Sequence, residues 1–267
     1  MKGFRPSIFV IFFLIIFLIP CGAIAEEKKV FTLDELLSMA LVSNPSAAVF
    51  KADLEASRGE AISASAYPNP EIDLEGGRGK SLEAGGSKGE YSVGIGQPIE
   101  WPSKRNFRKQ AAKASVEASE KELDDFRLQL RAEVKEAFFQ LLKDKKVLEI
   151  ARENSKIAGE LLKTVNLKVK AGEAPEFELV KAKVEALRAD KELRRAGNTI
   201  AASKAILNGL LGNTLKDDFD VEGAFKVPEK KYELQPLLSN AMEKHPLVLK
   251  AKKDAEAKGY SLERERA

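Results

Sequence analysis

The segment from residue 103 to residue 158 contains neither proline nor glycine, and this run limits the possible folds more than any other feature of the chain. The helical pattern continues to about Ala171, which corresponds to about 69 residues, or about 100 Å at 1.5 Å per residue. Helices of globular domains rarely exceed about 25 residues unless they form coiled coils. The sequence therefore predicts a mainly α-helical protein with a small β part, built around a long coiled coil.

A heptad repeat supports the coiled coil, because apolar residues recur at two positions in each seven. One position holds Val134, Leu141, Leu148, Leu162 and Val169, and the other holds Leu123, Leu130, Ala137, Ala151, Ala158 and Val165. Three polar residues, Arg127, Asp144 and Ser155, interrupt these rows. The rows predict a seam against which a second helix packs.

The helix is expected to turn back at Ala171-Gly-Glu-Ala-Pro175. Gly172 suits the left-handed position after a helix, and Pro175 suits the first turn of the next one. The returning helix, from about Pro175 to Leu211, carries two rows: Leu179, Ala186, Leu193, Ile200 and Leu207, and Ala182, Ala189, Ala196, Ser203 and Leu210. A turn this short makes the helices antiparallel neighbours, so residues 103–211 are predicted to form a helical hairpin.

Two strand-like segments precede the long helix. Apolar and acidic residues alternate in Glu71–Glu75, and large apolar residues alternate with small ones in Tyr91–Gly96. Alternation of this kind gives a strand one apolar face and one polar face. Residues 76–89 are rich in glycine, serine and charge and are expected to form a long loop. Residues 67–102 therefore predict a β-hairpin, which needs strands from another copy because a lone hairpin is marginal in water.

An internal repeat divides the chain, because Phe31–Pro45 aligns without gaps with Tyr232–Pro246. We expect residues 26–66 to form N-terminal helices and residues 212–231 to be an irregular connector. Residues 232–267 then open a second, truncated copy of the same unit.

The first 25 residues are typical of an export signal. Lys2 and Arg5 precede a short apolar run, and Ala23-Ile24-Ala25 fits a cleavage site. Lipidation of Cys21 is the alternative to cleavage after Ala25. Cleavage leaves no cysteine, and therefore no disulfide or thiolate chemistry. It also reduces the basic residues from 44 to 42 against 41 acidic residues, which offers no electrostatic footprint for nucleic acid.

The sequence offers little support for catalysis or metal binding. Gly76–Ser81 resembles a phosphate loop, but Leu74 stands where the Walker pattern requires glycine. His245 is the only histidine and precedes Pro246, which favours a role at a helix end over a metal site. Because no nucleophile is paired with a base, we predict a non-enzymatic protein without a cofactor.

Four stretches resemble the outer-membrane efflux proteins, the TolC-like outer-membrane factors of Gram-negative tripartite pumps. They are Thr32–Pro45, Pro68–Ile72, Ile95–Arg105 and Val169–Leu187. The order of the elements also fits, and the resemblance covers essentially all of the mature chain. The stretch that ends in Trp101-Pro-Ser-Lys-Arg105 is most similar to the branch that serves heavy-metal pumps.

The resemblance implies a homotrimer in which two hairpins per protomer close a twelve-stranded outer-membrane β-barrel. Outer-membrane lipid would then contact Ile72, Leu74, Tyr91, Val93 and Ile95. The lumen would be lined by Glu71, Asp73 and Glu75, with Ser92, Gly94 and Gly96. Trp101 would anchor the chain at the membrane interface, and packing beneath the barrel is the alternative role for this side chain.

The resemblance also implies that the helical hairpin extends into the periplasm and meets a membrane-fusion adaptor at its tip. The tip residues are Gly172, Glu173, Ala174, Pro175 and Glu176. Many family members carry serine or threonine where this chain has Pro175. The implied function is a passive duct for small molecules or metal ions, driven by an inner-membrane pump. Type I protein secretion and a periplasmic coiled-coil adaptor or structural protein remain as alternatives.

Overall fold

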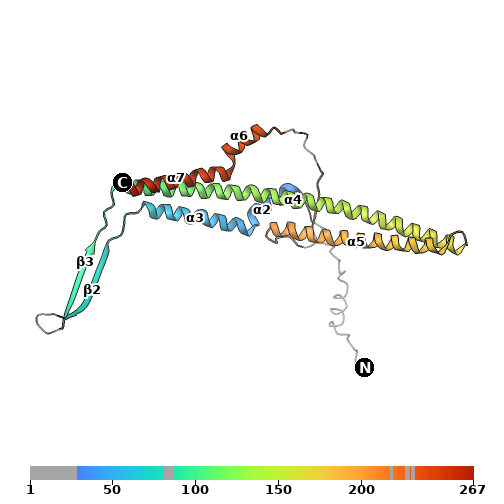
Figure 1. Cartoon of the computed structure of the whole chain (residues 1–267), viewed down its shortest axis with the longest axis horizontal. Helices are drawn as coiled ribbons and strands as arrows, with labels where there is room; N and C mark the ends of the chain where they lie inside the picture. The colour runs from blue at the N-terminus through green and yellow to red at the C-terminus, as the bar shows by residue number, and fades with distance from the viewer. Residues whose placement is uncertain (1–28, 81–86, 217–218, 226–228, 230–231) are drawn as a thin grey trace, which may run out of the picture.

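The computed structural model describes residues 29–80, 87–216, 219–225, 229 and 232–267. The predicted export signal, with Cys21, lies outside the described residues, and so does the middle of the predicted loop, residues 81–86. The described chain is elongated, with a β-hairpin at one end and a helical turn at the other (Figure 1). One long helix, α4, connects the two ends.

Helix α4 spans Pro102–Lys170 and is 69 residues long, which confirms the predicted long helix. It begins with a proline, whose missing N–H costs no hydrogen bond in the first turn. Gly172 follows its end with a φ of 76°, a conformation that only glycine adopts readily. Helix α5, Glu176–Leu210, then returns antiparallel along α4 and completes the predicted helical hairpin (Figure 1).

On α4, the seam with α5 is buried most deeply in the half that lies away from the tip, whereas α5 also buries a residue close to the tip. The α4 side of the seam buries Leu130, Val134, Leu141 and Asp144, and the α5 side buries Ala182, Ala196, Ser203 and Leu207. Beyond Asp144, toward the tip, α4 has no fully buried residue. A second apolar stripe on this part of α4 is exposed: Val147, Ile150, Ile157 and Leu161.

The main hydrophobic core lies near the middle of α4, where α2 (Leu33–Ser43), α5 and a small sheet meet. In this sheet, strand β1 (Lys29–Phe31) pairs in parallel with strand β4 (Phe219–Val221). The sequence predicts an irregular connector over 212–231, and this prediction is wrong at β4. Strands of three residues are too short to show alternation, and this pairing joins segments far apart in the sequence.

The predicted β-hairpin is present, but its strands are longer than predicted. Strand β2 spans Glu71–Lys80 and strand β3 spans Ser87–Gly96, and each has ten residues. The assignment of 76–80 and 87–89 to a loop is therefore wrong. Strand pairing uses backbone groups that glycine also carries, and the ring of Tyr91 covers Gly76, within 3.2 Å of where a Cβ would stand. The apolar partner thus compensates for the missing side chain.

The predicted internal repeat is visible as two pairs of helices with the same lengths. Helices α2 and α3 (Pro45–Ser65) have 11 and 21 residues, as do α6 (Leu234–Lys244) and α7 (Pro246–Arg266). Both α3 and α7 pack along α4 (Figure 1). Helix α2 buries its apolar face, whereas α6 leaves exposed the equivalent side chains Leu234, Leu237, Leu238 and Met242. Within the described residues, every helix is too short or too polar to cross a membrane.

Candidate functional site

The five side chains predicted to face lipid lie on one face of the β-hairpin. In the antiparallel register Ile72 pairs with Ile95, Leu74 pairs with Val93, and Gly76 pairs with Tyr91. Alternate residues of a strand point to the same side of the sheet. All five side chains are at least 70% exposed. The hairpin thus presents a continuous apolar surface that nothing in the described chain covers.

The three acidic residues predicted to face the lumen share the opposite face. Glu71 pairs with Gly96, Asp73 with Gly94 and Glu75 with Ser92. A small residue therefore lies opposite each carboxylate, and a Cβ at Gly94 would come within 3.7 Å of the Asp73 Cβ. No ion pair to these carboxylates is found among the described residues. This face of the hairpin is therefore acidic, and its three carboxylates are exposed.

Two arginines at the start of α4 join this helix to the end of α3, a role that the sequence did not reveal. Arg105 donates to the carbonyl of Ser65 at 2.7 Å, and its guanidinium lies 4.0 Å from the centre of the Tyr67 ring. Arg108 donates to the carbonyls of Ala64 and Ala66 at 3.0 and 2.9 Å. Carbonyls at the end of a helix lack partners within the helix. These arginines supply the hydrogen-bond donors for the last carbonyls of α3. In the sequence, the only hint of this role is the spacing of two basic residues three positions apart at the start of α4.

Trp101 is the residue immediately before α4, and its side chain is exposed at the junction of hairpin and helices. Glu100, beside it, pairs with Arg108 at 2.9 Å. The role of Trp101 as a membrane anchor and the alternative of packing beneath a barrel both stay predictions.

The helical tip is a short turn with little side-chain support. The N–H of Gly172 donates to the carbonyl of Val169, and the N–H of Glu173 donates to that of Lys168. Pro175 precedes α5 in an extended conformation and provides no side-chain cap. Of the five predicted contact residues only Ala174 is partly buried. Three exposed apolar side chains flank the tip and were not singled out from the sequence: Leu167, Phe177 and Val180.

Polar residues inside the helical packing make specific pairs. Asp144 is 5% exposed, and it accepts hydrogen bonds from the Ser203 hydroxyl at 2.6 Å and from the Gln140 amide at 2.9 Å. His245 accepts a hydrogen bond from the N–H of Leu247 and caps α7, which confirms the predicted helix-end role. On the same helix, the Lys253 ammonium donates hydrogen bonds to the carboxylates of Glu117 and Glu256, which raises the pKa of Lys253.

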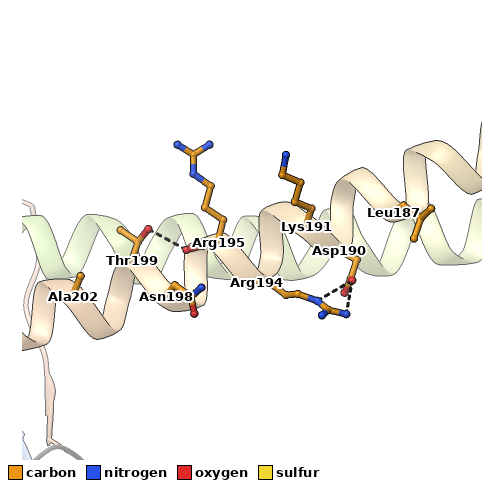
Figure 2. Close-up of a pocket in the computed structure, with 8 residues that line it drawn as sticks. All are labelled: Leu187, Asp190, Lys191, Arg194, Arg195, Asn198, Thr199 and Ala202. Atoms are coloured by element: carbon orange, nitrogen blue, oxygen red, sulfur yellow. Dashed lines mark hydrogen bonds and ion pairs between the residues drawn. The ribbon is translucent and has the colours of Figure 1, made fainter.

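Grooves on the helices are open surfaces without the features of a catalytic centre. The groove in Figure 2 has a volume of about 690 Å³ and lies along α5. Asp190 and Arg194 pair within it at 2.9 Å, and Thr199 donates to the carbonyl of Arg195 (Figure 2). Among the described residues, no cluster of three or more histidine, cysteine, aspartate or glutamate residues could hold a metal ion.

Known proteins with a similar sequence or fold are outer-membrane proteins and a metal-resistance protein. The cobalt-zinc-cadmium resistance protein CzcC of Cupriavidus metallidurans is 28% identical over 226 residues, which cover 84% of this chain and 52% of CzcC. A membrane protein from Pseudomonas aeruginosa has a TM-score of 0.69 at 22% identity, over 88% of this chain and 57% of that one.

The CmeC outer membrane channel of Campylobacter jejuni has a TM-score of 0.71 at 17% identity, over 88% of this chain and 52% of CmeC. The chain thus spans about half the length of the relatives it matches. These structures share its helical hairpin and β-hairpin fold. The family model for the outer membrane efflux protein matches residues 36–213, from α2 through the β-hairpin to the end of α5. The chain therefore belongs to the outer membrane efflux protein family.

Proposed function

We propose that this chain forms part of the outer-membrane duct of a tripartite efflux system. The observation that carries the proposal is the two-faced hairpin, because one register sorts the large apolar side chains from the carboxylates. The apolar face occupies the part of β2 and β3 nearer the helices, and the chain from Tyr91 to Trp101 has the about 9–11 residues that a transmembrane β-strand needs. The apolar face suits lipid, and the acidic face suits a water-filled lumen.

The hairpin supports assembly into a trimer. A two-stranded sheet leaves an unpaired row of backbone groups on each outer edge, and hydrocarbon offers these groups no partners. Only closure with further strands removes both edges. Three protomers that contribute hairpins to one barrel satisfy this requirement, as the family resemblance implies.

The helical hairpin supports coupling to a periplasmic adaptor. Helix α4 reaches about 100 Å from the hairpin and ends in the exposed turn at Gly172–Glu176. The neighbouring apolar side chains of Leu167 and Phe177 are exposed without a partner in the described chain. An adaptor that covers this end would bury apolar surface, and the inner-membrane pump would supply the energy. The duct itself would be passive, without catalytic residues or a cofactor.

The acidic face supports cations as cargo. Glu71, Asp73 and Glu75 repeat in every protomer of a trimer, and rings of carboxylates favour cations in a pore. The name of CzcC says that this relative confers resistance to cobalt, zinc and cadmium. We therefore propose divalent metal cations as the cargo, ahead of uncharged small molecules and secreted polypeptides.

The experiment compares two lysine substitutions at adjacent positions in the gene product that carries residues 1–267. Val93→Lys places a charge against lipid, which costs about 2–4 kcal/mol near the bilayer midplane. Ser92→Lys places the same charge beside Glu75 in the lumen. We expect a carbonate-resistant trimer in outer membranes for the unmodified protein and for Ser92→Lys, and its loss for Val93→Lys. Complete extraction of the unmodified protein by carbonate would refute the proposal and favour a periplasmic adaptor.

A further inference from the structure

Apolar residues recur at alternate positions beyond the end of β3, in the segment that leads to α4. Tyr91, Val93 and Ile95 are followed at the same alternate spacing by Ile99 and Trp101, which are 91% and 72% exposed. Gln97 interrupts the series, but its amide donates to the carbonyls of Pro68 and Pro98 at 3.0 and 3.2 Å. The polar group is therefore satisfied by backbone that would otherwise lack a partner in hydrocarbon.

The length of this surface matches an outer membrane. Ten residue steps lead from Tyr91 to Trp101, half of them beyond the end of β3, and they span at most about 33 Å at about 3.3 Å per residue. Strands of outer-membrane barrels tilt by about 35–45°, and the apolar band of such barrels is about 25 Å tall. A chain of about 33 Å at about 40° rises by about 25 Å. Aromatic residues thus stand at both ends of a band of the expected height, which is where membrane proteins place them.

The orientation of Tyr91 shows which end of the band is polar. Its ring lies against Gly76, and its hydroxyl lies 3.7 Å from where a Cβ on Gly89 would stand. Gly89 pairs with Arg78, one step farther from the helices than the Gly76–Tyr91 pair. One edge of the ring therefore covers Gly76, while its far edge and the hydroxyl reach the level of the Gly89–Arg78 pair.

Arg78 is the first charged residue beyond the band on the apolar face of the hairpin. The register places it on the same face as Leu74 and Tyr91, and it is exposed. Within the described part of the chain no carboxylate pairs with it, and the three acidic residues of β2 lie on the opposite face. The far end of the hairpin points away from the helical body (Figure 1), so it is the outer end if the helices are periplasmic.

We propose that Arg78 binds a phosphate group of the lipid headgroups in the outer leaflet. This inference rests on the proposed function, because it requires the hairpin to cross the outer membrane. A guanidinium binds phosphate oxygens through two parallel hydrogen bonds and carries its charge at any physiological pH. A side chain just beyond an aromatic girdle, on the lipid side, lies at the depth of such headgroups. Three copies around a trimer would form a basic ring at the outer surface.

The test is a binding titration of the assembled, purified protein in zwitterionic detergent with a bis-phosphorylated glucosamine glycolipid. Native mass spectrometry measures the bound fraction. Arg78→Gln is expected to weaken binding at least about 10-fold, since charge-assisted hydrogen bonds to phosphate are lost. Arg78→Lys keeps the charge and is expected to lose about 3-fold, because lysine binds phosphate as a point charge. Arg131→Gln, at an exposed arginine of α4, is the matched control and is expected to change nothing.

Three outcomes would overturn the inference while leaving the proposed duct intact. The first is unchanged glycolipid binding by a trimeric Arg78→Gln protein, and the second is an equal loss of binding in Arg131→Gln. The third is full competition by inorganic phosphate at the ionic strength of the titration, which would indicate an unspecific anion site. By contrast, an unmodified protein that neither trimerises nor resists carbonate would overturn the proposed function itself.

Discussion

Removal of the Ser203 hydroxyl should loosen the helical hairpin at one defined point. The Ser203 Oγ donates to the Asp144 Oδ2 at 2.6 Å, and the two residues are 7% and 5% exposed. Hydrogen bonds to charged groups contribute about 1.5–3 kcal/mol. Because Asp144 keeps its bonds to the Gln140 amide, we expect Ser203→Ala to cost about 1.5–2 kcal/mol, in the lower part of that range.

Hydrogen exchange followed by mass spectrometry measures this cost in the assembled protein. A loss of about 1.5–2 kcal/mol raises the local opening equilibrium by about 10–30-fold, so amides of α5 near residue 203 should exchange faster by that factor. Thr199→Val removes a hydroxyl one turn away that donates only to the carbonyl of Arg195 within its own helix. This control should change exchange by less than about 2.5-fold, as surface substitutions do.

A second background tests whether the charge of Asp144 is responsible. Asp144→Asn keeps the shape of the side chain but makes the hydrogen bond neutral, and neutral bonds are about half as strong. Ser203→Ala should therefore cost about half as much in that background. An exchange change below about 3-fold in the original background would refute the reasoning. So would an equal cost of Ser203→Ala in both backgrounds.

Three further substitutions have expected outcomes. The pKa of Asp220 is lowered because hydrogen bonds from Lys145 and the N–H of Val221 outweigh the burial of the carboxyl, which acts in the opposite direction. The pair therefore stabilises the fold above the unfolded pKa of about 3.9, and acid titration by circular dichroism should show this contribution disappear below that pH in the parent but not in Asp220→Asn. In Gly172→Ala the new Cβ has open space, but the residue must keep a φ of 76°. Thermal unfolding should therefore show a loss of stability of about 1–2 kcal/mol, the cost of the left-handed conformation. Unchanged stability would mean that the turn adopts another conformation in the variant. His245→Ala should speed exchange in the first turn of α7 through loss of a cap worth about 1 kcal/mol, whereas His245→Asn, which copies the first repeat, should not; equal effects would argue against capping.

The long helix and the hairpin could be predicted because their signals are local. A heptad row or an alternating strand is visible within a short window, and the seam residues Val134 and Leu141 follow from spacing alone. The sorting of the hairpin faces also follows from alternation, since Leu74 and Asp73 must point to opposite sides.

The rest depends on contacts between distant segments. Asp144 interrupts the heptad row in the sequence, and only the fold shows that Ser203 on the returning helix is its partner. The β1–β4 sheet joins two strands of three residues each, too short for a pattern. Arg105 and Arg108 bind backbone carbonyl groups at the end of α3. Every residue has such a carbonyl group, so the sequence does not indicate which ones an arginine will bind.

The Asp144–Ser203 pair separates two parts of the helical hairpin that differ in how deeply α4 is buried. The pair lies where full burial of α4 ends, so it fixes the register of α5 against α4 at that point. Toward the tip the α4 side of the seam is only half-buried, at residues such as Ala151 and Ala158, while small residues of α5 such as Ala182 and Ala196 stay buried against it. Small residues there would allow the helices to slide or open, which the proposed duct requires if it rearranges when the proposed adaptor binds.

Cysteine accessibility across the hairpin tests the central claim most directly. Single cysteines replace Asp73, Leu74, Val93 and Gly94 in intact cells, and a membrane-impermeant maleimide measures their exposure to water. The two-faced hairpin predicts rapid labelling at positions 73 and 94 and protection at positions 74 and 93, because the register places these pairs on opposite faces. Equal labelling of neighbouring positions would show water on both faces of the sheet and would contradict a hairpin that crosses the membrane.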